Sequence, residues 1–93
     1  MKPREVLRLA RKTKITYRHF RKCMGLTDFT EVWLDPAKEV LPTLIHELIH
    51  IRYPDLSETK VLRMERKIAI QFTSEDWIEL TVILAQQLQK GED

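Results

Sequence analysis

The stretch Leu44-Ile45-His46-Glu47-Leu48-Ile49-His50 places two histidines four residues apart, with a glutamate directly after the first. Positions i and i+4 lie on one face of an α-helix, so both imidazoles can reach the same metal ion. The surrounding apolar residues recur at helical spacing and predict a wide buried face: Leu41, Leu44, Ile45, Leu48 and Ile49. This stretch therefore predicts a central buried helix, over about residues 40–53, that holds a metal site.

Glu47 completes an H-E-x-x-H signature, in which two histidines bind zinc and the glutamate lies beside a zinc-activated water. A shuffled chain of this composition would contain the pattern with a probability of roughly 0.6%. Chance is therefore the weaker explanation. We expect His46 and His50 to bind one zinc ion and Glu47 to be the catalytic base.

The flanking sequence predicts a small α+β fold. Apolar spacing indicates an N-terminal helix over residues 3–12, and alternating residues predict strands over 14–20 and 29–34. After Pro54, two further amphipathic segments predict helices over about 57–72 and 74–90. We expect one domain over residues 1–93: N-terminal helix, short antiparallel sheet of two or three strands, active-site helix, glutamate helix and C-terminal helix.

Composition limits the class of protein. The chain has 93 residues, of which 43% are hydrophobic, as in a small globular domain. Cys23 is the one cysteine, so no intrachain disulfide can form. No apolar run approaches the roughly 20 residues that span a bilayer, and the N-terminal residues lack the apolar core of a secretory signal. We expect a cytoplasmic protein that does not bind membranes.

Charge is distributed unevenly along the chain. Residues 1–22 contain nine Lys/Arg and one acid, whereas residues 74–93 contain five acids and one Lys. Such asymmetry is compatible with a nucleic-acid partner. We favour the simpler interpretation, a solvated basic face that pairs loosely with the acidic C-terminal segment.

The third zinc ligand is not fixed by spacing. Catalytic zinc usually takes three protein ligands, and no histidine follows His50, so the third is an acid unless His19 returns to the site. Glu58 and Glu65 lie seven residues apart on the next predicted helix. If that helix folds back antiparallel, helix rise alone brings both acids within similar reach of the metal.

Residues 40–72 resemble the minigluzincins, small soluble metallopeptidase domains, and short H-E-x-x-H proteins with a Tyr/Phe-Pro-Asp-Leu-Ser-Glu turn after the metal helix. That turn is here Tyr53-Pro54-Asp55-Leu56-Ser57-Glu58, and Val32-Trp33-Leu34-Asp35-Pro36, a strand before Asp-Pro, fits the same pattern. The resemblance implies a zincin-like fold and favours Glu58 as the acidic zinc ligand, with Glu65 as its rival.

We therefore predict a zinc-dependent metallopeptidase that acts on peptides or proteins. If the strand ending at Leu34 is a sheet edge, its backbone could align the substrate over residues 30–34 by strand addition. Tyr53 and His19 are the candidates for stabilising the oxyanion.

Other hypotheses for the function stay open at this point. The last helix could lie across the cleft, with Glu79, Glu92 or Asp93 on the metal, and keep the enzyme latent as a zymogen. The chain could be a metal-dependent binding module without turnover, or a DNA-associated protease that uses its basic N-terminal helix. A homodimer is also compatible with so small a core.

Overall fold

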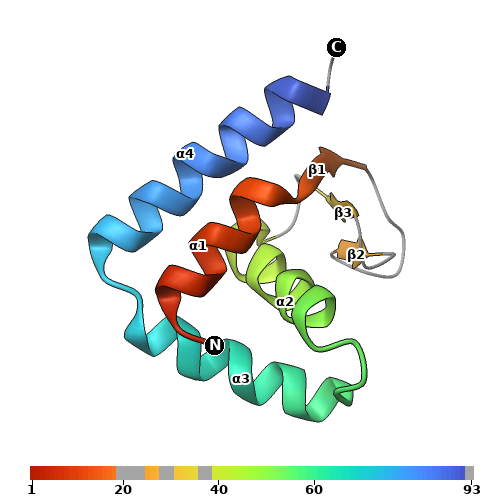
Figure 1. Cartoon of the computed structure of the whole chain (residues 1–93), viewed down its shortest axis with the longest axis vertical. Helices are drawn as coiled ribbons and strands as arrows, with labels where there is room; N and C mark the ends of the chain where they lie inside the picture. Colours follow the sequence, from red (N-terminus) through yellow and green to blue (C-terminus); the bar gives the residue numbers. More distant parts are fainter. Residues whose placement is uncertain (19–24, 28–30, 36–38, 92–93) are drawn as a thin grey trace.

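The computed structural model describes residues 1–18, 25–27, 31–35 and 39–91, and within these ranges it contains four helices and three short strands (Figure 1). The elements are α1 (Pro3–Lys12), β1 (Lys14–Tyr17), β2 (Gly25–Thr27), β3 (Glu31–Leu34), α2 (Val40–Arg52), α3 (Glu58–Gln71) and α4 (Ser74–Gly91). The α+β class and the four predicted helices are confirmed. Cys23 and His19 lie outside the described residues.

The strands form a mixed sheet, in the order β1-β3-β2. β2 pairs antiparallel with β3, but β1 pairs with β3 in parallel, so the prediction of an antiparallel sheet is wrong for this pair. Ile15 and Val32 are neighbours in the parallel register, and both are fully buried. Alternation of apolar residues fixes which face a strand buries but is the same for either strand direction.

The position of β3 also corrects the proposed substrate edge. β3 contains most of the segment 30–34, and it is the central strand, hydrogen-bonded to β1 on one side and β2 on the other. A strand paired on both sides has no free row of backbone groups for an added peptide strand. Strand addition at residues 31–34 is therefore excluded.

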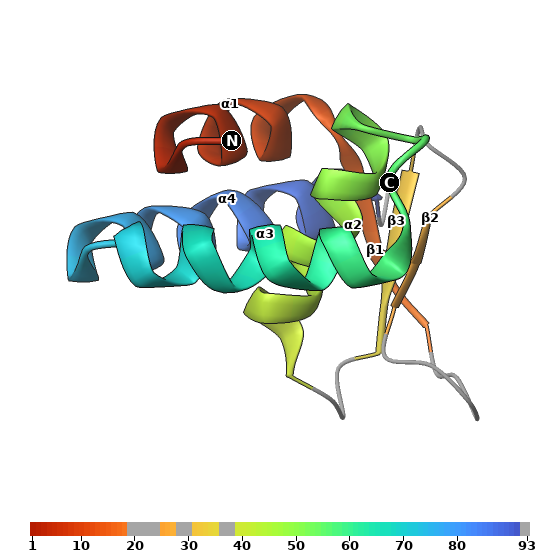
Figure 2. The same ribbon diagram turned by 90° about the horizontal axis from the view of Figure 1, so that it is seen from below.

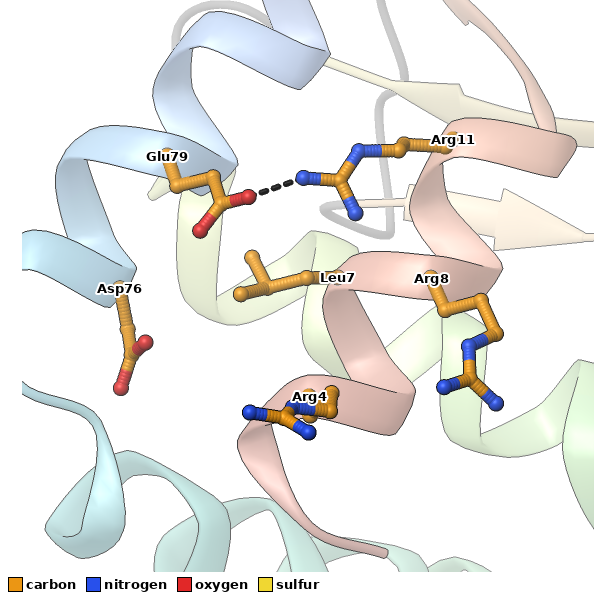
Figure 3. Close-up of a pocket in the computed structure, with 6 residues that line it drawn as sticks. All are labelled: Arg4, Leu7, Arg8, Arg11, Asp76 and Glu79. Atoms are coloured by element: carbon orange, nitrogen blue, oxygen red, sulfur yellow. Dashed lines mark hydrogen bonds and ion pairs between the residues drawn. The ribbon is translucent and has the colours of Figure 1, made fainter.

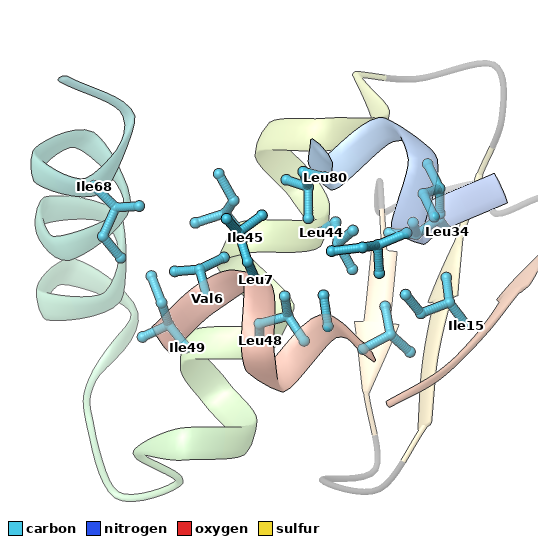
Figure 4. Close-up of a cluster of buried hydrophobic side chains, with 14 of the residues drawn as sticks. Val6, Leu7, Ile15, Leu34, Leu44, Ile45, Leu48, Ile49, Ile68 and Leu80 are labelled. Carbon is cyan, nitrogen blue, oxygen red and sulfur yellow. The ribbon is translucent and has the colours of Figure 1, made fainter. Parts of the chain in front are cut away.

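The core forms where α2 is enclosed by the other elements (Figure 4). Of the five residues predicted for the buried face of the motif helix, Leu41 is partly buried and the other four are fully buried: Leu44, Ile45, Leu48 and Ile49. They meet apolar side chains from α1, α3, α4 and the sheet, namely Val6, Leu7, Ile68, Leu80, Ile15 and Leu34. Figure 2 shows the helices on one side of the sheet, and α2 contacts both the sheet and α3.

The last helix, α4, packs chiefly on α1 and β1. Leu80 and Leu84, two apolar residues of the amphipathic segment predicted over residues 74–90, are buried. Gln87 is also buried, and its side-chain amide donates hydrogen bonds to the carbonyls of Ala10, at 3.3 Å, and Arg11. These carbonyls are at the C-terminal end of α1, where helix geometry leaves carbonyl groups without an intrahelical partner; that of Ala10 also accepts the Thr13 N–H at 3.3 Å.

Replacing Gln87 with alanine is expected to destabilise the fold by about 1–3 kcal/mol, because two carbonyls lose a buried donor. The measurement is the urea unfolding midpoint of Gln87→Ala beside Gln86→Ala, which alters an exposed neighbour on the same helix. Equal midpoints for the two variants would show that the contact between α4 and the end of α1 contributes nothing.

No helix in the described ranges combines the length and apolar character needed to cross a membrane.

Candidate metal centre

The motif helix forms as predicted and brings its two histidines to one face. Pro42 is the third residue of α2, a position in the first turn where its missing N–H costs no helical hydrogen bond. One turn apart, the rings of His46 and His50 have centroids 4.9 Å from each other. Their side chains are 15% and 17% exposed, so both histidines lie at the boundary between the core and the solvent.

The turn after α2 returns the chain to these histidines. Pro54 cannot continue the helix, and Ser57 caps the next one by accepting a hydrogen bond from the Lys60 N–H at 3.4 Å. Helix α3 therefore begins at Glu58 and packs against α2. The start of α3 lies beside the C-terminal end of α2 (Figures 1 and 2), and there Glu58 contacts His50.

Three side chains converge at this point. Glu58 Oε1 lies 2.5 Å from His50 Nε2, and Glu58 Oε2 lies 3.2 Å from His46 Nε2. One donor atom from each of His46, His50 and Glu58 lies within 4.8 Å of the other two. This cluster, which we call the metal triad, has the donor atoms and the spacing to hold a metal ion.

Glu65 occupies a different position on the same imidazole. Its Oε1 lies 2.9 Å from His46 Nδ1, the ring nitrogen opposite the one that meets Glu58. Only Glu58 contacts both Nε2 atoms, so of the two rival acids it is the one that belongs to the metal triad. The seven-residue spacing could not separate them, because both face α2 from one side of α3.

Glu47 is buried beside the metal triad, with 8% of its surface exposed. Burial raises the pKa of its carboxyl group above the usual value, although the nearby His46 and His50 oppose that shift. A carboxylate with a raised pKa holds a transferred proton more readily than an exposed glutamate does. Its position next to His46 thus suits a base that takes up and returns one proton.

Glu58 has the opposite electrostatic setting. Its slight burial alone would raise the pKa, but attraction to His46 and hydrogen bonds from both imidazoles outweigh burial, and the pKa of Glu58 falls below its usual value. Glu58 is therefore held in the ionised form that a metal ligand requires.

The proposed oxyanion residues gain no support from contacts. Tyr53 lies under the Arg52 guanidinium, 4.8 Å from ring centroid to Cζ, and no hydrogen bond joins its hydroxyl to the metal triad within the described part of the chain. His19 falls outside the described residues, so its predicted role is untouched.

The alternative that the last helix covers the site gains no support from the residues that the structure describes. Glu79 pairs with Arg11 on α1, and α4 packs chiefly on α1 and β1, away from the junction of α2 and α3 that forms the metal triad (Figures 1 and 3). Glu92 and Asp93 lie outside the described residues. Apolar periodicity identified the buried face of α4 but not the element that covers it.

The contact between Arg11 and Glu79 brings part of the basic N-terminal helix against part of the acidic C-terminal segment. Arg4, Arg8 and Arg11 line a pocket of about 450 Å³ together with Asp76 and Glu79 from α4 (Figure 3). The interpretation that the basic N-terminal helix pairs with the acidic C-terminal segment is confirmed for Arg11 and Glu79.

The sequence matches no protein-family model, and neither the curated proteins nor the solved structures contain a significantly similar chain.

Proposed function

We propose that this chain is a zinc-dependent metallopeptidase with a zincin-like fold similar to that of the minigluzincins. The observation that supports the proposal is the convergence of His46, His50 and Glu58 from two helices, with Glu47 buried directly beside them. Two imidazoles and one carboxylate are the ligand set of catalytic zinc in several hydrolases, which keep the fourth position for water.

The spacing of the donors is compatible with zinc. Zinc binds nitrogen and oxygen at about 2.0–2.2 Å in a tetrahedron, which puts neighbouring ligand atoms about 3.3 Å apart. The distance from His46 Nε2 to Glu58 Oε1 is 3.3 Å, which matches this edge. His50 Nε2 lies closer to Glu58, at 2.5 Å, and a small rotation of the exposed Glu58 side chain would open that edge.

The chemistry divides between the ion and the chain. Zinc, when bound, supplies a Lewis acid that activates water and polarises the peptide carbonyl. Glu47 accepts the proton of the attacking water and then delivers it to the nitrogen of the leaving amine, which departs neutral. His46, His50 and Glu58 would hold the ion, and Glu47, buried beside them, is placed to carry the proton.

Metal removal tests the proposal. The purified chain with one equivalent of zinc is incubated with a mixed library of unstructured peptides, and the products are read by mass spectrometry. We expect new cleavage products that disappear after treatment with a chelator and return when zinc is restored.

Two results of this experiment would contradict the proposed metallopeptidase. Cleavage that survives chelation would contradict a metal mechanism. Zinc binding with no cleavage anywhere in the library would indicate the alternative, a metal-dependent binding module without turnover.

A further inference from the structure

Glu65 is an acid in an unfavourable place unless it has a partner. It lies in the middle of α3, on the side that faces α2, and its side chain is only 22% exposed. A partly buried carboxylate is costly without compensation. The contact that compensates it is the one with His46, whose Nδ1 lies 2.9 Å from Glu65 Oε1.

This contact selects one form of the imidazole. In the metal-free chain each nitrogen of His46 faces a carboxylate, but a ring that ligates a metal through the Nε2 lone pair keeps its one N–H on Nδ1, where Glu65 accepts it. Nε2 is the atom of His46 that points to Glu58, in the metal triad. The two acids of α3 therefore meet opposite edges of the same ring.

The arrangement also restrains the ring in space. His46 is held between Glu58 at Nε2 and Glu65 at Nδ1, and both acids come from one face of a single helix, two turns apart. His50 has no corresponding acid at its Nδ1 within the described part of the chain. The effect of Glu65 should thus be confined to one of the two histidines.

We propose that Glu65 is a positioning residue: it accepts the Nδ1–H of His46, fixes the ring orientation and presents Nε2 to the metal. The inference depends on the proposed metal site but not on peptide hydrolysis. A carboxylate behind a ligating histidine also makes the ligand nitrogen more basic, and loss of such outer partners typically weakens metal binding by about 10–100-fold.

The test measures the zinc affinity of the full chain by competition with a chromophoric chelator. Glu65→Ala is expected to weaken binding by about 10–100-fold. Glu65→Gln should lose less, because its amide oxygen still accepts the N–H although the charge is gone. Glu75→Ala, which removes an exposed acid from the first turn of α4, serves as the control and should bind zinc like the wild type.

A second readout separates positioning from simple support of the fold. In the zinc-loaded wild type, NMR should show a downfield Nδ1–H proton on His46, since the acceptor is charged. The signal should shift upfield in Glu65→Gln and exchange away in Glu65→Ala. If Glu65→Ala does not fold, the zinc affinity and the His46 Nδ1–H signal of Glu65→Gln test the positioning role.

The outcomes distinguish the two proposals. Zinc affinity and His46 signals that are unchanged in the Glu65 variants would overturn the positioning role and leave the proposed metallopeptidase intact. A wild-type chain that binds no zinc would overturn both. Zinc binding that weakens as expected, in a wild type that cleaves no peptide, would support the role of Glu65 and contradict only the hydrolytic function.

Discussion

Glu47→Gln is expected to lower the rate of peptide cleavage by about 10²–10⁴-fold, the usual contribution of a general acid–base group, while zinc affinity stays within a few-fold of the wild type. Glutamine has nearly the shape of glutamate but cannot accept the proton of the attacking water. The ligands are untouched, since Glu47 is not one of the metal triad. The measurement compares kcat for one cleaved peptide and zinc affinity in the two proteins.

Loss of folding would not explain such a result. Because burial raises the pKa of Glu47, the folded state binds its proton more tightly than the unfolded state does. Stability of the metal-free wild type therefore falls as pH rises from the unfolded value through the raised folded one. Glutamine removes that penalty, so metal-free Glu47→Gln should be at least as resistant to urea at pH 7. Undiminished cleavage by this variant would show that Glu47 is not the base.

Removal of either His50 or Glu58 is expected to weaken zinc binding by more than roughly 100-fold, because loss of an outer partner alone already costs about 10–100-fold. Glu58 offers the cleaner variant: its side chain is 65% exposed, so Glu58→Ala should hardly change the urea midpoint of the metal-free protein. Asp55→Ala, an exposed acid in the same turn, is the matched control.

The same series decides between the two acids. Zinc affinity that is normal in Glu58→Ala but abolished in Glu65→Ala would reverse their assignments. The third ligand would then be Glu65, and α3 would have to rotate to bring it to the Nε2 side of His46.

Prediction from sequence succeeded where a residue's environment depends on near neighbours. The apolar positions around His46 and His50 fall at helical spacing, so the chain itself determined both the helix and the shared face of the two histidines. Pro54 and Ser57 likewise fixed the end of one helix and the start of the next through local backbone chemistry.

It failed where the answer depends on how distant segments meet. Ile15 and Val32 were identifiable as strand residues, but their parallel pairing depends on the path of the chain between them. The sequence did not show whether Glu79 would cover the metal site or pair with a basic residue. It pairs with Arg11, which is 68 residues away in the chain. Spacing left Glu58 and Glu65 open because they share one helix face; the resemblance favoured Glu58, which is the acid that clusters with His46 and His50.

Zinc titration of the metal-free, folded wild-type chain by calorimetry tests the metal triad most directly. We predict saturation at one zinc ion per chain, with binding lost in His46→Ala and in His50→Ala. A folded wild type that takes up no zinc, or that binds it as well after both histidines are removed, would contradict the assignment of this site.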